Sequence, residues 1–328
     1  MRIAIIGTGS IGRRHIGNLL KLGVQDIVAV SEHNRRSDLK IDGSDIAISH
    51  DFNTTLEEGV DAVFICNPTS MHLSYVKTAL RAGVHIFLEK PAATSANGVE
   101  EMVQLANDHN TIIAVGHQYR FNKMLNAFRS KVDDGLLGSL LSVEGNLGEH
   151  IADYHPEEDY RQSYAARADL GGGVLLTQIH QIDYLNWIFG PFDSVYAIGG
   201  KCSALNIDVE ASVSYLLRTH SCVPVFGHLD YLQRPKRVTL SATGDKGRLD
   251  WDYFANRLTF TPASLDATPV IEETIFDRNA MFLDLTQDFL TAITTGGLPR
   301  STLRDGLTAL QIVDAIKTSF QKNLVVEL

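Results

Sequence analysis

Cysteine is scarce in this sequence. Three residues, Cys66, Cys202 and Cys222, are spread over 328 positions. Their odd number and wide spacing exclude a disulfide framework and a cysteine-based metal site. Histidines and carboxylates show no metal-ligand spacing either, so we expect no metal. A chain with this cysteine usage is typical of a reducing compartment, and we expect it in the cytoplasm.

Long apolar runs and basic runs are also missing. The longest apolar stretches reach about a dozen residues, whereas a membrane-spanning helix needs about 20. The start, Met1-Arg2-Ile3-Ala4-Ile5-Ile6-Gly7, enters a strand-like run without a cleavage site, so we expect neither export nor a membrane partner. Lys plus Arg number 29 against 39 Asp plus Glu, a net charge of −10, which disfavours nucleic acid as a partner.

The composition is that of a soluble globular protein, and the length suits two domains. Hydrophobic residues make up 44% and charged residues 21% of the 328 positions. In residues 1–120, continuous apolar runs alternate with helical patterns, which predicts a doubly wound parallel sheet of the Rossmann type. The expected strands are Ile3–Ile6, Ile27–Val30, Ala62–Cys66, His85–Leu88 and Ile112–Val115, and the expected helices are Ile11–Leu22, Ser70–Ala82 and Ser95–Asp108.

From residue 121 the pattern changes, and we expect residues 121–328 to form an α+β domain with an open, mainly antiparallel sheet. Leu141–Leu147 alternates apolar and polar residues, and several strand candidates follow between Val195 and Ile275. A charged and aromatic loop is expected near Glu149–Asp169. The expected helices are Asn122–Asp133, Val174–Phe189, Met281–Thr294 and Arg304–Phe320.

A glycine motif, Gly7-Thr8-Gly9-Ser10-Ile11-Gly12, lies between the first strand and the first helix. Gly7 allows a tight turn, Gly9 leaves room for a pyrophosphate, and Gly12 lets helix and strand approach closely. The amides at the start of the helix would hold the phosphates, so the motif predicts a dinucleotide site. The alternative is a glycine-rich turn without a ligand.

The preference between NAD and NADP depends on the end of the second strand. Glu32 follows the last motif glycine by about 20 residues, where a carboxylate binds the ribose 2′-hydroxyl of NAD. Arg35 and Arg36 lie just beyond it and are suited to the 2′-phosphate of NADP. We expect NAD and leave NADP open, and Glu32 as a solvated loop charge remains the alternative.

Glu89-Lys90-Pro91 follows the fourth strand, at the edge where open parallel sheets bind ligands. A partly desolvated lysine beside a positive nicotinamide ring would have a lowered pKa, which suits proton chemistry. Taken alone, Lys90 is equally typical of a solvated lysine at a strand end.

Together these motifs resemble those of the glucose-fructose oxidoreductase, inositol dehydrogenase and MocA family (Gfo/Idh/MocA). The resemblance covers the whole chain and includes Cys66-Asn67-Pro68-Thr69-Ser70-Met71-His72, Gly116-His117-Gln118-Tyr119-Arg120-Phe121 and a Gly171-Gly172-Gly173 helix that carries His180. It implies a Rossmann domain, an open-sheet second domain and an NAD(P)-dependent oxidoreductase of sugars, sugar acids or cyclitols. It also implies a homodimer or homotetramer formed through the open sheets.

By this resemblance Lys90 and His180 are the catalytic residues. Asn67, Pro68, His72 and Glu89 would border the nicotinamide ribose. The family's Asp four residues before the His is replaced here by Leu176, with Thr177 beside it, and Asp183 lies three residues after His180. His180 as an ordinary helix histidine remains the alternative.

The loop around His155–Tyr164 resembles a segment from a branch of this family that serves unusual-sugar or surface-polysaccharide pathways. Its residues Asp159, Tyr160, Arg161 and Tyr164 offer donors, acceptors and a stacking ring for a polyol. Tyr119, Arg120 and Thr177 are further candidates to bind substrate. A polar connection between domains, and for Arg120 an interdomain ion pair, are the alternatives.

We expect hydride transfer from a secondary alcohol, with His180 moving the hydroxyl proton and Lys90 stabilising the alkoxide, although the two roles could be exchanged. Two other functions remain open: a nucleotide-binding regulatory or scaffold protein without catalysis, and an enzyme that uses NAD for transient oxidation during elimination or hydrolysis.

Overall fold

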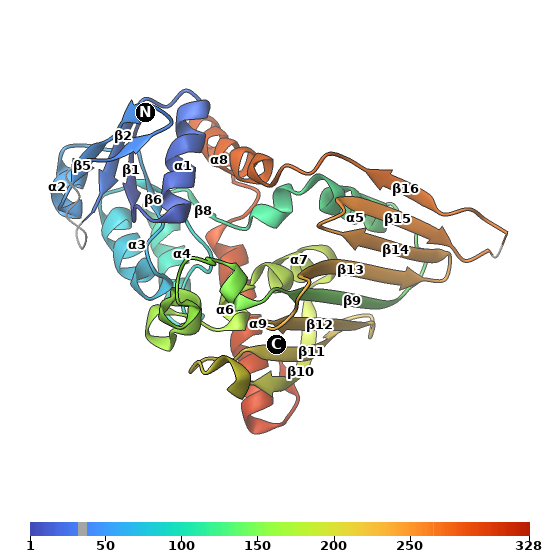
Figure 1. Cartoon of the computed structure of the whole chain (residues 1–328). Coiled ribbons are helices and arrows are strands. Elements are labelled where there is room, and N and C mark those ends of the chain that lie inside the picture. Colours follow the sequence, from blue (N-terminus) through green and yellow to red (C-terminus); the bar gives the residue numbers. More distant parts are fainter. Residues whose placement is uncertain (32–37, 265) are drawn as a thin grey trace. The chain divides into compact units, whose positions relative to one another are not determined.

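The computed structural model describes residues 1–31, 38–264 and 266–328, and these form two compact units (Figure 1). The first unit joins Met1–Gln118 to Arg278–Thr308, and the second joins Tyr119–Asp277 to Ala309–Leu328. The sequence suggested a single boundary after residue 120. In the structure the chain also returns to the first unit, from Arg278 to Thr308.

Parallel strands form the sheet of the first unit, as the sequence predicted. Its order over the described residues is β5-β2-β1-β6-β7-β8, and every neighbouring pair is parallel. β5 is a short edge strand that the sequence pattern did not reveal. The strands are β1 (Arg2–Ile6), β2 (Asp26–Val30), β5 (Ala47–Ser49), β6 (Ala62–Ile65), β7 (His85–Leu88) and β8 (Ile113–Val115).

The predicted helices of this unit are present, with one clearly displaced start, and the short helix Phe52–Glu57 was not predicted. The predicted helix from Ser95 begins only at Val99, because Gly98 before it has a left-handed φ of 81°. A small hairpin follows β2 in the chain. These elements are α1 (Ser10–Lys21), β3 (Lys40–Ile41), β4 (Ser44–Asp45), α2 (Phe52–Glu57), α3 (His72–Arg81), α4 (Val99–Asp108) and α8 (Arg278–Thr295).

Helix α8 belongs to the first unit because its apolar side chains complete that unit's core. It lies beside α1 (Figure 1). The ring of Phe289 meets those of Phe64 and Phe87 edge-on, with centroids 5.6 and 5.7 Å apart. These two rings come from β6 and β7, so α8 fills a space that the first 118 residues leave open.

The sheet of the second unit is mixed and mainly antiparallel. Its order over the described residues is β16-β15-β14-β13-β9-β12-β11-β10-β17, and β9 with β12 is the parallel pair (Figure 1). The strands are β9 (Leu140–Gly148), β10 (Phe192–Gly200), β11 (Ser212–Thr219), β12 (Pro224–Asp230), β13 (Arg237–Gly244), β14 (Gly247–Asp252), β15 (Arg257–Pro262), β16 (Val270–Glu273) and β17 (Val326–Glu327). The predicted fold class, a Rossmann sheet followed by a domain with an open sheet, is confirmed.

Helices cover one face of this sheet. The predicted helix from Val174 to Phe189 is divided, since Gln178 and Ile179 separate α6 (Val174–Thr177) from α7 (His180–Phe189). The loop expected before it contains short 3-10 turns. The remaining elements are α5 (Lys123–Asp133), the turns Ile151–Asp153, Tyr160–Gln162, Tyr164–Ala166 and Ala168–Leu170, and α9 (Leu303–Lys322).

The other face of the sheet carries exposed apolar side chains. Leu216 and Phe226 are cross-strand partners, and Ile198 pairs with Ser214 on the same face. Pairing of copies through this face stays a prediction. Among the described residues, no helix has the length and apolarity required to cross a membrane.

Phe289 provides a test of the part that α8 plays. Phe289→Ala removes a fully buried ring from the core of the first unit, and we expect the free energy of unfolding to fall by about 3–5 kcal/mol. The measurement is urea denaturation followed by circular dichroism. Leu298→Ala, at a side chain that is 87% exposed in the same unit, should change it by less than about 0.5 kcal/mol. Equal stability of both variants would show that α8 does not support this core.

Candidate functional site

The glycine turn forms the first part of the candidate site. Gly7 has a φ of +92°, and a Cβ there would lie 2.9 Å from the backbone nitrogen of Asn67. A Cβ on Gly12 would collide with the Gly7 carbonyl oxygen. At Gly9, by contrast, the described residues leave open space within 4 Å. Packing against the protein's own backbone therefore requires glycine at positions 7 and 12, whereas Gly9 leaves room for another molecule. Thr8 in this turn is buried, and Ser10 and Ile11 begin α1.

Asn67 lies beside this turn, two residues beyond the end of β6. Neither the nitrogen nor the oxygen of its buried side-chain amide has a hydrogen-bond partner among the described residues. A buried amide without partners is costly, so a ligand with both a donor and an acceptor would stabilise this position. Pro68, the next residue, precedes a 3-10 turn at Thr69–Met71. The open space at Gly9 and the Asn67 amide are what a dinucleotide requires at this edge.

His72 connects two of the loops at this edge. Its Nδ1 lies 2.9 Å from the carbonyl oxygen of Pro91, and its Nε2 lies 2.9 Å from that of Asn67. Burial lowers the pKa of His72, although both carbonyls oppose this. The ring thus holds together the loops that follow β6 and β7, and its contact with a ribose stays a prediction.

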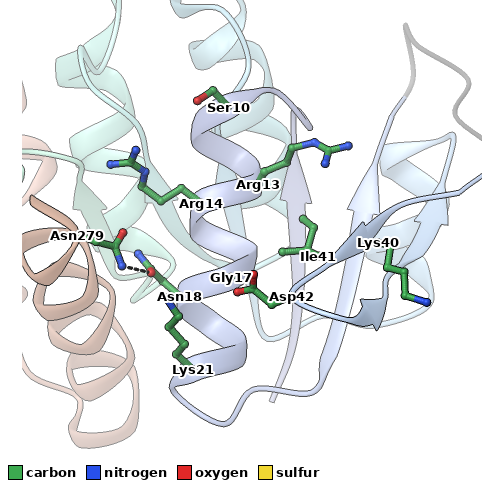
Figure 2. A pocket seen from close by; sticks show the side chains of 10 residues that line it. All are labelled: Ser10, Arg13, Arg14, Gly17, Asn18, Lys21, Lys40, Ile41, Asp42 and Asn279. Atoms are coloured by element: carbon green, nitrogen blue, oxygen red, sulfur yellow. Dashed lines mark hydrogen bonds between the residues drawn. The ribbon is translucent and has the colours of Figure 1, made fainter.

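The residues expected to select between NAD and NADP, namely Glu32, Arg35 and Arg36, lie outside the described residues. A groove of about 460 Å³ runs over the outer surface of α1 and shares Ser10 with the glycine motif (Figure 2). The Asn279 amide donates to the Asn18 side-chain oxygen in its wall, at 2.9 Å. The lining residues are Ser10, Arg13, Arg14, Gly17, Asn18, Lys21, Lys40, Ile41, Asp42 and Asn279.

Lys90 follows β7 at the same edge and is half-buried. Burial lowers the pKa of its ammonium group from 10.5 to about 8; the nearby charge of Arg278 acts in the same direction and Glu89 opposes it. A lysine with this pKa changes its charge near neutral pH, which an ordinary surface lysine does not.

Glu89 is turned into the protein. One carboxylate oxygen lies 2.7 Å from Nε2 of His15, a residue of α1, and the other accepts the backbone N–H of Lys90 at 3.1 Å. His15 was not among the site residues expected from the sequence. The available signal was its place on α1, three residues after Gly12 and on the side that packs against the sheet.

The second unit contains His180, the first residue of α7. It is buried, and its ring meets that of Tyr119 edge-on with the centroids 5.0 Å apart. Leu176, where the resemblance led us to expect an Asp, is buried in α6. An aromatic group surrounds Tyr119, comprising Tyr184, Trp251 and Tyr253.

Arg120 and Asp183 form a buried ion pair within the second unit. The guanidinium and carboxylate groups are 3% and 1% exposed. Nε of Arg120 donates to Oδ2 at 3.0 Å, and a terminal nitrogen donates to Oδ1 at 2.7 Å. The ion pair given as the alternative for Arg120 is thus present. Its partner lies beyond the boundary expected after residue 120, but the structure assigns both residues to the second unit. The pair ties the segment after β8 to the helix that begins with His180.

The remaining candidates for substrate binding belong to the second unit. Thr177 is buried and accepts the Tyr231 hydroxyl at 2.6 Å. The Tyr160 hydroxyl donates to the Leu205 carbonyl at 3.0 Å, and Arg161 pairs with Asp159 at 2.8 Å on the surface. The side chain of Tyr164 is exposed. Their part in substrate binding stays a prediction.

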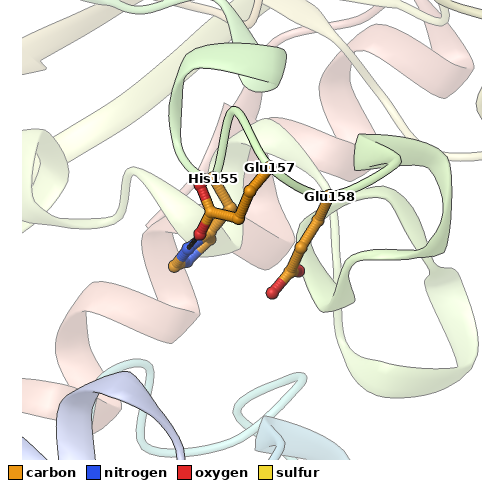
Figure 3. Close-up of side chains that lie close together, drawn as sticks. All are labelled: His155, Glu157 and Glu158. Carbon is orange, nitrogen blue, oxygen red and sulfur yellow. Dashed lines mark ion pairs between the residues drawn. The ribbon is translucent and has the colours of Figure 1, made fainter.

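A small group of potential metal ligands, not expected from the sequence, lies in the same loop. One ligand atom each from His155, Glu157 and Glu158 lies within 4.8 Å of the others (Figure 3). Both glutamates are exposed and all three residues are close in sequence. Exposed acidic groups of this kind are common at protein surfaces, and the group gives no reason to assign a metal.

Comparison with protein families connects both units to one family. A family model described as "Oxidoreductase family, NAD-binding Rossmann fold" (GFO_IDH_MocA) matches residues 1–117. The model described as "GFO/IDH/MocA C-terminal domain" matches residues 125–250. The two matched regions thus belong to one family, and the first lies in the first unit and the second in the second unit.

Individual relatives have low sequence identity to this chain, but the similarity extends over most of it. Inositol 2-dehydrogenase/D-chiro-inositol 3-dehydrogenase of Halalkalibacterium halodurans is 28% identical, over 74% of this chain and 62% of its own length, which is less than two thirds. Myo-inositol 2-dehydrogenase of Thermotoga maritima is 26% identical, over 100% of this chain and 98% of its own length. The solved structure of levoglucosan dehydrogenase in complex with NADH and levoglucosan has a TM-score of 0.89 at 19% identity, over 100% of this chain and 99% of that one. At that identity the likeness establishes the fold.

The Arg120–Asp183 pair leads to a stability prediction. Asp183→Asn leaves the guanidinium of Arg120 buried without its counter-charge, and we expect the second unit to lose about 3–5 kcal/mol of stability. Thermal and urea denaturation, followed by the fluorescence of Trp187 and Trp251, measure this. Asp169→Asn removes an equivalent but exposed partner of Arg167 and should have little effect. A stable Asp183→Asn variant would show that the buried pair is dispensable.

Proposed function

The chain belongs to the Gfo/Idh/MocA oxidoreductase family, and from this premise we propose that it transfers a hydride between a nicotinamide cofactor and a secondary alcohol or ketone. The substrate we propose is a sugar, a sugar acid or a cyclitol. The names of two relatives, inositol and levoglucosan dehydrogenase, support this substrate class.

One observation carries the proposal. β1, β6 and β7 are neighbours in the sheet, and the residues just beyond their carboxyl ends are Gly7, Asn67 and Lys90. Ligands of open parallel sheets bind at this edge. Here it combines an open space at a glycine, an amide with no hydrogen-bond partner in the described part of the chain, and a lysine with a pKa near 8.

The bound nicotinamide supplies the group that accepts or donates the hydride. For the chain's own residues, we assign the transfer of the hydroxyl proton to His180. The ammonium group of Lys90 donates a hydrogen bond that stabilises the negative charge developing on the substrate oxygen. Asn67 positions the cofactor, and the Glu89 carboxylate stabilises the charge on Lys90.

A second candidate function is nucleotide binding without turnover. Leu176 at the position of the family's Asp favours it, since the usual acidic companion of the histidine is absent there. Such a protein would bind NADH and leave every polyol unchanged. An enzyme with a transient oxidation step would instead convert its substrate without net formation of NADH, which product analysis detects.

Cofactor binding is tested with NADH and NADPH in parallel fluorescence titrations. We expect selective binding of NADH, and we expect Gly9→Ala to weaken it at least about tenfold, because the new methyl group occupies the space left for the pyrophosphate. Gly9 has a φ of −72°, so alanine fits the backbone without strain. Gly297→Ala, in the same unit, is the matched control. Preferential binding of NADPH would assign NADP, and binding of neither would refute the cofactor assignment.

The role of Lys90 is tested by turnover with myo-inositol, levoglucosan and D-xylose. Lys90→Ala should lower kcat about 100-fold or more while NADH still binds, and Lys77→Ala, which removes a surface ion pair, should not. In the wild type the ammonium form is lost above its pKa, so kcat/KM should fall as the pH rises through about 8. A rise through the same pH would instead make Lys90 the proton acceptor.

A further inference from the structure

A histidine and a glutamate make contact in the interior of the first unit, 74 residues apart in sequence. Nε2 of His15 lies 2.7 Å from Oε1 of Glu89, and the two side chains are 0% and 9% exposed. We propose that His15 is a positioning residue for Lys90 and that it acts through Glu89. This inference rests on the catalytic role proposed for Lys90.

The Glu89 carboxylate has little freedom to move. His15 binds one oxygen, and the backbone N–H of Lys90 donates to the other at 3.1 Å. Gly116 packs directly against the carboxylate, since a Cβ there would lie 3.0 Å from Oε2. The backbone N–H of Glu89 also donates to the Ile65 carbonyl at 3.0 Å. The orientation of this carboxylate is thus set by groups from four segments of the unit.

The His15 ring is equally confined. Three aromatic rings surround it, with centroids at 4.8 Å for Phe87, 5.4 Å for Phe64 and 6.2 Å for Phe282. Nδ1 has no hydrogen-bond partner among the described residues. A buried N–H without an acceptor is costly, so we place the ring hydrogen on Nε2, where it points to Glu89. His15 is therefore a donor to the carboxylate.

This donor keeps Glu89 ionised. Burial alone would raise the pKa of Glu89, but the hydrogen bond from His15 and the charge of Lys90 hold it below its ordinary value. Removal of the donor leaves a buried carboxylate that gains stability by binding a proton. The charge of Glu89 also acts on two buried neighbours. Burial raises the pKa of Cys66 and Glu89 adds to that rise, whereas burial lowers the pKa of His72 and Glu89 opposes that fall.

The charge of Glu89 determines the proton affinity of Lys90. Burial and Arg278, from α8, lower the pKa of the lysine to about 8, and Glu89 opposes them. If Glu89 is neutralised, the affinity of Lys90 for its proton falls further, and less ammonium is present at neutral pH. Because His15 is on α1, one helix carries both the cofactor turn and the group that supports the catalytic lysine.

The test measures the titration of Lys90 directly in the full chain, without cofactor or substrate. Lysine labelled with ¹³C at Cε reports each pKa by NMR, and the signal missing from Lys90→Arg identifies Lys90. We expect a midpoint near 8 in the wild type. His15→Phe, which fills the aromatic pocket without a donor, and Glu89→Gln should each lower the proton affinity of Lys90 by about tenfold or more. The double variant should add no further fall.

Three comparisons separate this role from a merely structural one. His15→Gln keeps an amide donor and should leave the midpoint within about twofold in proton affinity of the wild type. His15→Leu has no donor and must lower it as His15→Phe does. His109→Phe, on the surface of the same unit, must leave it unchanged. An unchanged midpoint in His15→Phe and His15→Leu, together with a lowered midpoint in Glu89→Gln, would overturn the proposal.

The proposed function is tested by a different measurement, the turnover of Lys90→Ala. Retained turnover in Lys90→Ala would refute the catalytic role of Lys90. The titration is recorded without catalysis, so it still shows whether His15 acts on Lys90 through Glu89.

Discussion

Parallel pairing of β1, β6 and β7 is the constraint on which the candidate site depends. The register places Ile6 beside Ile65, and Ile65 beside Leu88. The next residues of all three strands therefore leave the sheet at the same level. A tight glycine turn, an asparagine and a Glu-Lys pair become neighbours for this reason, although Lys90 follows Gly7 by 83 positions in the sequence. The place of Lys90 beside the glycine turn and Asn67 follows from this edge.

Burial gives these residues their chemistry, and each buried group requires a compensating partner. Glu89 stays charged inside the protein because His15 and a backbone amide donate to it. Lys90 has a lowered pKa because burial and Arg278 outweigh Glu89. In the second unit, Asp183 compensates the buried charge of Arg120 and so supports the helix that begins with His180. A surface site would not shift these proton affinities as far, since water would solvate each charge.

Much of the fold was predictable because it depends on local patterns. Apolar runs identified β1, β6 and β7 to within a residue, and the glycine spacing identified the start of α1. Local patterns did not predict the features that depend on tertiary contacts. β5 is short and at the edge, and the break between α6 and α7 has no glycine or proline to mark it. Helix α8 has an ordinary helical pattern, and only its contacts with Phe64 and Phe87 assign it to the first unit.

The sequence by itself predicted the two-domain α/β architecture and a turn suited to a dinucleotide, and its resemblance to a known family gave the candidate residues Lys90 and His180. Periodicity and motif spacing are properties of neighbouring residues, and they are legible without coordinates. The tertiary structure decided which side chains compensate one another: Glu89 with His15, Arg120 with Asp183, and His72 with two backbone carbonyls. Such pairs join segments that are far apart in the chain, and their energy arises only when folding removes both partners from water.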